Sequence, residues 1–330
     1  MTHGGNVWQG VSPEGWLDFS ANLRPEGPPD WVMQAMAGAL RETRYYPDVA
    51  MRAAREGLAV YAGVPAACIL PTAGGIEAID ILCRSGVGRV LTMPPTFGEY
   101  ARRAQVYNRE DAPFTSAEAV RRGDVVILCN PNNPTGKAME RDRVLELGQA
   151  IQSAGGALAV DEAFIDLCPE KSVRDQAARQ PGLVAIGSLT KALAIPGTRL
   201  GYLVAAPAWV ERFGTLAAPW SLNAFAAAVA RALPAHLHEL VEDRRLNDLR
   251  RDALSKSLAA LGAKALPSQA NFLLADFGRP MAETVQALKR EGILVRECKS
   301  FGLPANFLRL AVRTEAENAR LIAALERALS

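Results

Sequence analysis

The chain carries the stretch Ser188-Leu189-Thr190-Lys191, and Arg199 follows eight residues after the lysine. A hydroxyl just before a lysine and an arginine just after it suit a site that holds a phosphorylated aldehyde while the lysine amine bonds to the aldehyde carbon. The guanidinium stays protonated, and its fork matches two phosphate oxygens. Burial and nearby positive charge would favour the neutral amine that this bond requires. Because Ser-x-x-Lys is also common on solvated helix faces, the prediction of a pyridoxal 5'-phosphate (PLP) site needs further motifs.

A second motif lies thirty residues upstream, where the apolar run Ala157-Leu158-Ala159-Val160 ends in Asp161. The run predicts a short buried strand. In open α/β sheets, ligands bind at the carboxyl ends of the strands, so Asp161 stands where a ligand is expected. A carboxylate there would pair with the pyridine nitrogen of PLP and keep it protonated, which makes the ring an electron sink. The alternative is an acidic cap on the next helix.

A third motif joins the apolar run Val125-Val126-Ile127-Leu128-Cys129 to Asn130-Pro131-Asn132-Asn133-Pro134-Thr135-Gly136. The first part is typical of a buried parallel strand. The second predicts a tight irregular loop, because proline, asparagine and glycine all favour turns. The amide of Asn133 can donate a hydrogen bond to the phenolic oxygen of PLP. The alternative is a plain turn, for which the loop is unusually elaborate.

In this order and at this spacing, the three motifs resemble the fold-type I PLP enzymes, specifically the class I/II aminotransferase superfamily. The resemblance covers nearly the whole chain. It implies an α/β fold of the aspartate aminotransferase type, with a mostly parallel sheet in a large domain and a smaller α+β domain. It also implies that PLP is the cofactor, and that its binding residues are Gly74, Gly75, Phe97, Asn133, Asp161, Ser188, Lys191 and Arg199.

Within this resemblance, Lys191 is the Schiff-base lysine, and Ser188 with Arg199 forms the phosphate clamp. Gly74 and Gly75 belong to a glycine-containing helix start whose amide groups would face the phosphate. An ordinary helix start is the alternative there. Phe97 takes the place of the aromatic residue that stacks on the cofactor ring.

The resemblance assigns catalytic roles to Lys191, Asp161 and Tyr46. Tyr46 falls in the segment whose tyrosine reaches the phosphate of the neighbouring subunit, which implies a homodimer with shared active sites. One position departs from the common pattern. Many relatives have tyrosine three residues after the aspartate, as a second donor to the phenolate, and this chain has Phe164. Without the tyrosine hydroxyl, the proton equilibrium of the Schiff base should shift.

The resemblance also implies a set of substrate-binding residues. Arg309 would grip the substrate carboxylate, and Arg296 occupies a position that lies near the phosphate in relatives with phosphorylated substrates. A solvated charge on a strand is the alternative for both arginines. At the N-terminus, His3, Gly4 and Asn22 would take part, because glycine amides can approach an anion closely. A frayed tail is the alternative for the first few residues.

The N-terminal segments 3–6 and 17–25 resemble the threonine-phosphate decarboxylases of cobalamin biosynthesis. The resemblance implies PLP-dependent decarboxylation of L-threonine O-3-phosphate to (R)-1-amino-2-propanol O-2-phosphate. One alternative is an aminotransferase for a phosphorylated amine such as histidinol phosphate. Another is a PLP-binding protein without turnover, which the complete residue set makes a poor explanation. The same residues serve decarboxylation and transamination, so the outcome depends on which bond stands perpendicular to the cofactor ring.

Length and composition agree with a two-domain enzyme. At 330 residues the chain exceeds one comfortable core. We expect an N-terminal arm over 1–30 that joins the small domain, a large domain over 31–218 and a small domain over 219–330. The 37 basic and 35 acidic residues are interspersed and leave a net charge of +2, which argues against a nucleic-acid surface.

The sequence also predicts several absences. The five cysteines lack paired spacing and mostly stand in apolar surroundings, as in reduced cytoplasmic proteins, so we expect no disulfide and no metal. His236 and His238 are two residues apart and would point to different sides of a helix. The start of the chain lacks a signal pattern, and the apolar stretch 224–233 is too short to span a membrane. A cytoplasmic location is therefore expected.

Overall fold

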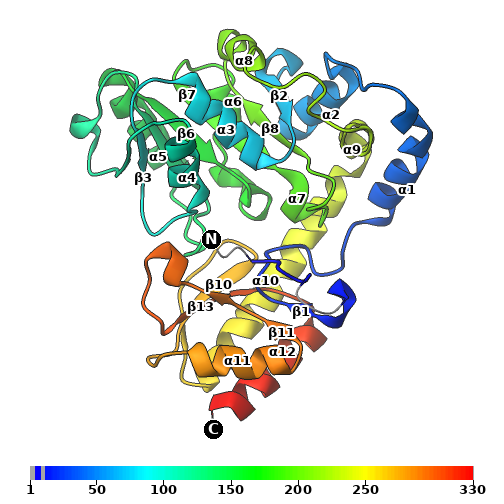
Figure 1. Cartoon of the computed structure of the whole chain (residues 1–330), viewed down its shortest axis with the longest axis vertical. Coiled ribbons are helices and arrows are strands. Elements are labelled where there is room, and N and C mark those ends of the chain that lie inside the picture. Colours follow the sequence, from blue (N-terminus) through cyan, green and yellow to red (C-terminus); the bar gives the residue numbers. More distant parts are fainter. Residues whose placement is uncertain (1–3, 9–11, 330) are drawn as a thin grey trace.

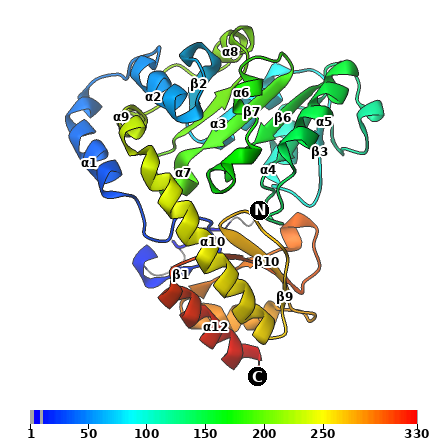
Figure 2. The ribbon, with the colours of Figure 1, turned by 180° about the vertical axis from the view of Figure 1, so that it is seen from behind.

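The computed structural model describes residues 4–8 and 12–329. Figure 1 shows two units, a larger one built on a wide sheet and a smaller one that holds the C-terminus and strand β1 (Leu17–Asp18). Helix α10 (Leu237–Ala260) runs from the larger unit into the smaller one, as Figure 2 shows from behind. The arrangement confirms the predicted α/β class.

The larger unit is organised by a seven-stranded sheet in which only one interior strand breaks the parallel direction. In spatial order the strands are β2 (Ile69–Thr72), β8 (Gly201–Val204), β7 (Leu183–Ser188), β6 (Ala157–Asp161), β5 (Val125–Cys129), β3 (Val90–Thr92) and β4 (Asp111–Pro113). Strand β8 pairs antiparallel with both neighbours, and the pairs from β7 to β4 are all parallel. Both predicted strands, β5 and β6, are buried along their whole length, as a sheet covered on both faces requires.

Helices cover the two faces of this sheet. One face packs against α1 (Asp30–Gly38), α2 (Arg52–Ala62), α5 (Arg141–Ser153), α6 (Arg174–Ala177) and α9 (Ala224–Ala232). The other packs against α3 (Gly75–Ser85), α4 (Glu99–Val106) and α8 (Pro207–Gly214). Within β6, Leu158 and Val160 belong to the first core, whereas Ala157 and Ala159 belong to the second. This alternation follows from the two-residue period of a strand.

The smaller unit has its own sheet and core. Its antiparallel sheet consists of β12 (Arg296–Glu297), β13 (Phe307–Ala311), β10 (Phe272–Asp276) and β9 (Lys264–Ala265), and β1 pairs with β11 (Ile293–Leu294) in a separate parallel pair. Helices α11 (Ala282–Arg290) and α12 (Glu315–Leu329) cover these strands together with the second half of α10. Leu17 and Phe19 of the N-terminal segment lie in this core, so the segment packs with the smaller unit.

The boundary between the units differs from the expected one at residue 219. Helix α9 packs against α1 and α2, and its Ala226 and Val229 lie in the core of the larger unit. Leu254 and Leu258, in the second half of α10, lie in the core of the smaller unit. We therefore propose a boundary within α10. The alanine-rich composition of α9 marks a helix but does not reveal which core the helix joins.

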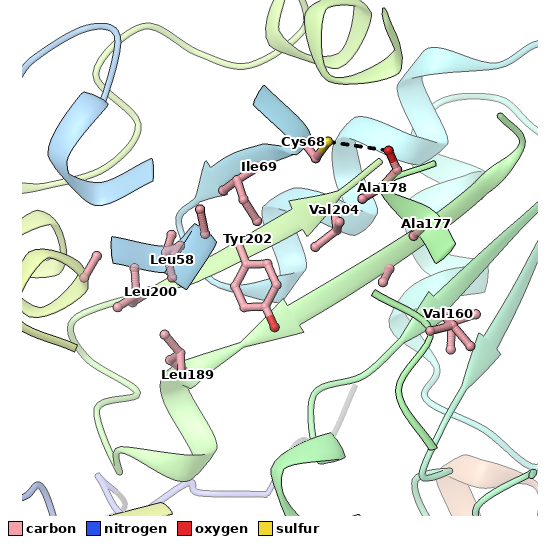
Figure 3. Close-up of a cluster of buried hydrophobic side chains, with 14 of the residues drawn as sticks. Leu58, Cys68, Ile69, Val160, Ala177, Ala178, Leu189, Leu200, Tyr202 and Val204 are labelled. Atoms are coloured by element: carbon pink, nitrogen blue, oxygen red, sulfur yellow. Dashed lines mark hydrogen bonds between the residues drawn. The ribbon is translucent and has the colours of Figure 1, made fainter. Parts of the chain in front are cut away.

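The segment that carries Lys191 is anchored by two leucines. Short helix α7 (Leu189–Ala192) follows β7 directly, and Leu189 and Leu200 are fully buried on either side of the lysine. Figure 3 shows both leucines beside Tyr202 in the core between the sheet and its helices. Burial of the two leucines holds both ends of the segment 189–200 against the sheet. Lys191 and Arg199 are thereby placed near the carboxyl end of β7.

Residues 4–8 and 12–329 contain no helix that is both long and apolar enough to cross a membrane. All five cysteines are buried and free. Over the same described residues, no three His, Cys, Asp or Glu side chains come together as a metal site.

Candidate active site

The predicted cofactor residues converge at the carboxyl ends of β5, β6 and β7. Cys129 and Asp161 are register partners at the ends of β5 and β6, and Lys191 stands in the helix that follows β7. One cavity of about 220 Å³ is lined by seven of the predicted residues, which are Gly4, Asn22, Phe97, Asn133, Asp161, Lys191 and Arg309. The structure therefore brings together side chains that are up to 305 positions apart in the sequence.

Asp161 is buried in the floor of this cavity. Its Oδ2 accepts a hydrogen bond of 2.6 Å from the hydroxyl of Tyr100, and its Oδ1 accepts one of 3.0 Å from the amide of Ala163. Burial raises the pKa of Asp161, while the two hydrogen bonds and the charge of Lys191 lower it. A protonated pyridine nitrogen at this carboxylate would offset the cost of burying its charge, so the residue fits the predicted partner of PLP.

The sequence reasoning missed Tyr100 as the residue that orients Asp161. Tyr100 is fully buried on the first turn of α4, and Phe97 lies three residues before it. The two rings meet edge to face with centroids 5.5 Å apart. Phe97 precedes α4, so no helical periodicity linked the two rings in the sequence.

Lys191 lies in an environment that favours its neutral amine. Burial, followed by the charges of Arg309 and Arg199, lowers its pKa to about 8. The charge of Asp161 acts in the opposite direction. The two causes named from the sequence, burial and nearby positive charge, are therefore both present.

This lowered pKa gives a pH dependence for cofactor attachment. Only the neutral amine attacks an aldehyde, so the rate at which PLP bonds to the cofactor-free protein should rise with pH and level off above a midpoint near 8. An ordinary lysine, with a pKa near 10.5, would give a rate still rising at pH 9. Stopped-flow absorbance of the imine measures the profile. Arg309→Gln should move the midpoint upward, and an unchanged midpoint would contradict the role of Arg309.

The structure brings Gly74, Gly75, Ser188 and Arg199 of the predicted phosphate clamp together. Gly74 has a φ of +79°, and a Cβ atom added there would come within 2.5 Å of Nη2 of Arg199. The amide groups at the start of α3 follow Gly74 directly, and Ser188 Oγ lies 2.8 Å from the hydroxyl of Thr190. Amides at a helix start, two hydroxyls and a guanidinium are the donors that bind a phosphate, so these residues fit the phosphate of PLP. Thr190 is an addition to the predicted set.

Arg309 is held by two acceptors on different elements. Its Nη1 donates to Oδ1 of Asn133 at 2.6 Å, and its Nη2 donates to the carbonyl of Ser20 at 2.5 Å. Its Nε is buried and has no hydrogen-bond partner among the described residues. Because Oδ1 of Asn133 is occupied by Arg309, the amide NH2 of Asn133 is the part that can donate to a ligand.

Arg296 and Arg309 are register partners on the neighbouring strands β12 and β13. They are 8% and 5% exposed. Arg296 Nη2 donates to Ser300 Oγ at 2.6 Å, and its guanidinium lies 5.1 Å from the centre of the Phe301 ring. Like charges directly opposite on a sheet are destabilising, and burial makes them more so. The pKa of Arg309 falls to about 10, chiefly because of burial and then because of Arg296.

The N-terminal segment enters the same cavity. An added Cβ on Gly4 would come within 2.0 Å of the Ser20 carbonyl oxygen, so no larger residue fits there. The amide of Gly5 donates to Ser20 Oγ at 2.8 Å. Asn22 is 3% exposed, and its Oδ1 is buried without a partner in the described structure. His3 lies outside the described residues, so its predicted role stays a prediction.

Phe164 lies at the wall of the cavity, whereas Tyr46 lies outside it. Phe164 is buried at the cavity wall, where its ring meets Phe272 at 5.1 Å. Tyr46 is 82% exposed, and its ring lies 4.9 Å from that of Trp220 in a separate depression on the surface. It does not line the cavity of its own chain, and its predicted reach into a neighbouring subunit stays a prediction.

Comparison with known proteins places the chain among PLP enzymes. Residues 14–325 match the aminotransferase class I and II family. The chain is 33% identical to a threonine-phosphate decarboxylase from Salmonella typhimurium, over 99% of this chain and 96% of that protein. It is also 33% identical to a histidinol-phosphate aminotransferase from Symbiobacterium thermophilum, over 95% of this chain and 90% of the relative.

Solved structures agree with this result. The L-threonine-O-3-phosphate decarboxylase from Porphyromonas gingivalis superposes with a TM-score of 0.83 at 26% identity, over 94% of this chain and 98% of that one. The histidinol-phosphate aminotransferase from Sinorhizobium meliloti, solved in complex with PLP, superposes with a TM-score of 0.85 over 100% and 98% of the two chains, at 23% identity. The chain therefore belongs to the aminotransferase class I and II family, whose members use PLP as cofactor.

Proposed function

We propose that the protein is a PLP-dependent lyase that decarboxylates L-threonine O-3-phosphate to (R)-1-amino-2-propanol O-2-phosphate in cobalamin biosynthesis. The pair Arg296 and Arg309 carries this proposal. Two buried arginines opposite each other on adjacent strands are costly unless anions neutralise both. L-Threonine O-3-phosphate carries a carboxylate and a phosphate on one small molecule, so it can satisfy both arginines at once.

Arg309, Asp161 and Lys191 would each have a separate role in this reaction. Arg309, held by Asn133 and Ser20, binds the substrate carboxylate and sets its direction relative to the cofactor ring. Asp161, oriented by Tyr100, keeps the pyridine nitrogen protonated. When bound, PLP accepts the electron pair that remains on the α-carbon after carbon dioxide leaves. Lys191, with its pKa near 8, returns one proton to that carbon, so that a carbon–hydrogen bond replaces the carbon–carboxylate bond.

A second candidate is an aminotransferase that acts on a phosphorylated amine such as histidinol phosphate. The equal identity to a histidinol-phosphate aminotransferase supports this alternative. In that reaction the phosphorylated amine and a 2-oxo acid would use the two arginines in successive half-reactions. The N-terminal segment supports the decarboxylase, because it carries the resemblance to those enzymes and its Gly4 and Asn22 line the cavity.

We further propose that the protein is a homodimer with shared active sites. Several large apolar side chains near Tyr46 are exposed in the single chain, namely Leu40, Tyr45, Val49 and Trp220. A patch of this kind is typical of a surface that another protein chain covers. Tyr46 would then reach the cofactor phosphate of the partner.

Incubation of the PLP-loaded protein with L-threonine O-3-phosphate and no 2-oxo acid tests the proposed reaction. We expect carbon dioxide and aminopropanol phosphate in equal amounts over many turnovers, measured by mass spectrometry. A matched reaction contains histidinol phosphate with 2-oxoglutarate. Amino transfer in that mixture, with no release of carbon dioxide in the first, would replace the decarboxylase by the aminotransferase.

A further inference from the structure

A second cavity, lined by Arg296, adjoins the one that contains Lys191 and extends it toward helix α4, because Phe97, Asn133 and Arg309 line both. This extension has a volume of about 320 Å³, and its lining includes Gly4, Phe97, Arg102, Arg296, Ser300 and Arg309. Three of its lining side chains are arginines, and no acidic side chain lines it among the described residues. A concave surface lined by positive charge of this kind favours anions.

Charge balance indicates that two arginines are too few for the proposed substrate. A phosphate ester carries a charge of about −1.5 to −2 near neutral pH, and a carboxylate adds −1. With Arg309 committed to the carboxylate, Arg296 is the one arginine of this strand pair that can face the phosphate. A buried phosphate with one cationic partner would keep close to one uncompensated negative charge, which is expensive away from water.

Arg102 supplies the missing positive charge. We propose that Arg102 is a second ligand of the substrate phosphate, placed opposite Arg296 across the extension of the cavity. This inference rests on the proposed function, because it concerns the phosphorylated end of that substrate. Arg102 belongs to α4 of the larger unit, whereas Arg296 belongs to β12 of the smaller unit, so a bound phosphate would be held between the two units.

The present position of Arg102 is compatible with this role. Its Nη1 lies 2.8 Å from Oε2 of Glu99, three residues earlier on the helix, and its side chain is 48% exposed. Glu99 is buried and therefore holds the guanidinium at the rim of the cavity. The pair uses only Nη1 of Arg102, and a guanidinium has five N–H donors, so other donors of Arg102 can bind a phosphate while the pair with Glu99 persists.

The sequence alone did not single out Arg102. Arg102 and Arg103 are adjacent on α4, and the sequence treats them alike. In the fold, Arg103 is paired with Asp80 and lies against the ring of Tyr107, away from the cavity lining. Arg102 lines the cavity and Arg103 does not, and this difference follows from how α4 packs in the fold.

The test compares Arg102→Gln with Arg143→Gln in the PLP-loaded protein. Arg143 is a matched control because it forms the same kind of pair, with Glu146 three residues later on α5, and is also exposed. For Arg102→Gln we expect KM for L-threonine O-3-phosphate to rise about tenfold with kcat little changed, since a charge-assisted hydrogen bond is lost. The preference for phosphorylated over unphosphorylated L-threonine should fall by a similar factor, and Arg102→Lys should recover part of it.

Titration calorimetry with inorganic phosphate gives a readout that needs no turnover. Arg102→Gln should weaken phosphate binding to the PLP-loaded protein about tenfold, whereas Arg143→Gln should not change it. Equal phosphate affinity in the two variants would overturn the role of Arg102. If the unmodified protein releases no carbon dioxide but the calorimetric difference persists, the proposed reaction fails while the phosphate ligand stands.

Discussion

Replacement of Lys191 by alanine is expected to remove the covalent link to PLP and to lower kcat by about 1,000-fold or more. Two functions are lost together, because Lys191 is the only lysine lining the described cavity and is also the group placed to return the proton. Its pKa near 8 suits both functions, since the amine can be neutral for bonding and protonated for donation within a narrow pH range.

Borohydride reduction followed by mass spectrometry measures the link directly. The unmodified protein should gain one reduced cofactor at Lys191, and the alanine variant should gain none. Lys256→Ala is the matched control, because Lys256 is exposed on α10 and does not line the cavity. A small exogenous amine should restore part of the activity of the Lys191→Ala protein by supplying a proton donor. Turnover at the unmodified rate in this variant would contradict every catalytic assignment made above.

Replacement of Asp161 by asparagine is expected to lower kcat by about 100- to 1,000-fold while PLP remains attached. The two side chains have nearly the same shape, so the contacts with Tyr100 and Ala163 can persist. The variant loses the negative charge, and the pyridine nitrogen is then no longer held protonated. The ring becomes a weaker electron sink although its position is unchanged.

Tyr100→Phe is the graded comparison for this prediction. It keeps the carboxylate but removes the 2.6 Å hydrogen bond that lowers the pKa of Asp161. Its kcat should fall by less than that of Asp161→Asn, and its activity should decline at a higher pH as the solution is acidified. Absorbance spectra of the two PLP-loaded variants show whether the cofactor is bound. If Asp161→Asn retains both PLP and full activity, activity does not depend on Asp161 keeping the pyridine nitrogen protonated.

Much of the site could be predicted because its residues sit next to strong local signals. The buried run before Asp161 predicted strand β6, and the loop rich in proline and asparagine after β5 marked Asn133. Strands buried on both faces produce continuous apolar runs, and ligands gather at their carboxyl ends. The positions of Asp161 and Lys191 in one cavity follow from these two facts.

Other features depended on how distant segments pack. Tyr100 meets Asp161 across a sequence separation of 61 residues, and α9 joins a different core from the one expected. The pairing of Arg296 with Arg309 requires the register of β12 against β13, and a shift by one residue would turn one guanidinium to the other face. No local pattern encodes that register.

The sequence by itself therefore determined the family and the cofactor, because these are recorded in short motifs whose chemistry is local. The tertiary structure alone decided which charges come together: Arg296 and Arg309 as partners on adjacent strands, and Arg102 in the lining of the same cavity. The physical reason is that electrostatic interaction depends on distance and burial in space, and neither is fixed by separation along the chain.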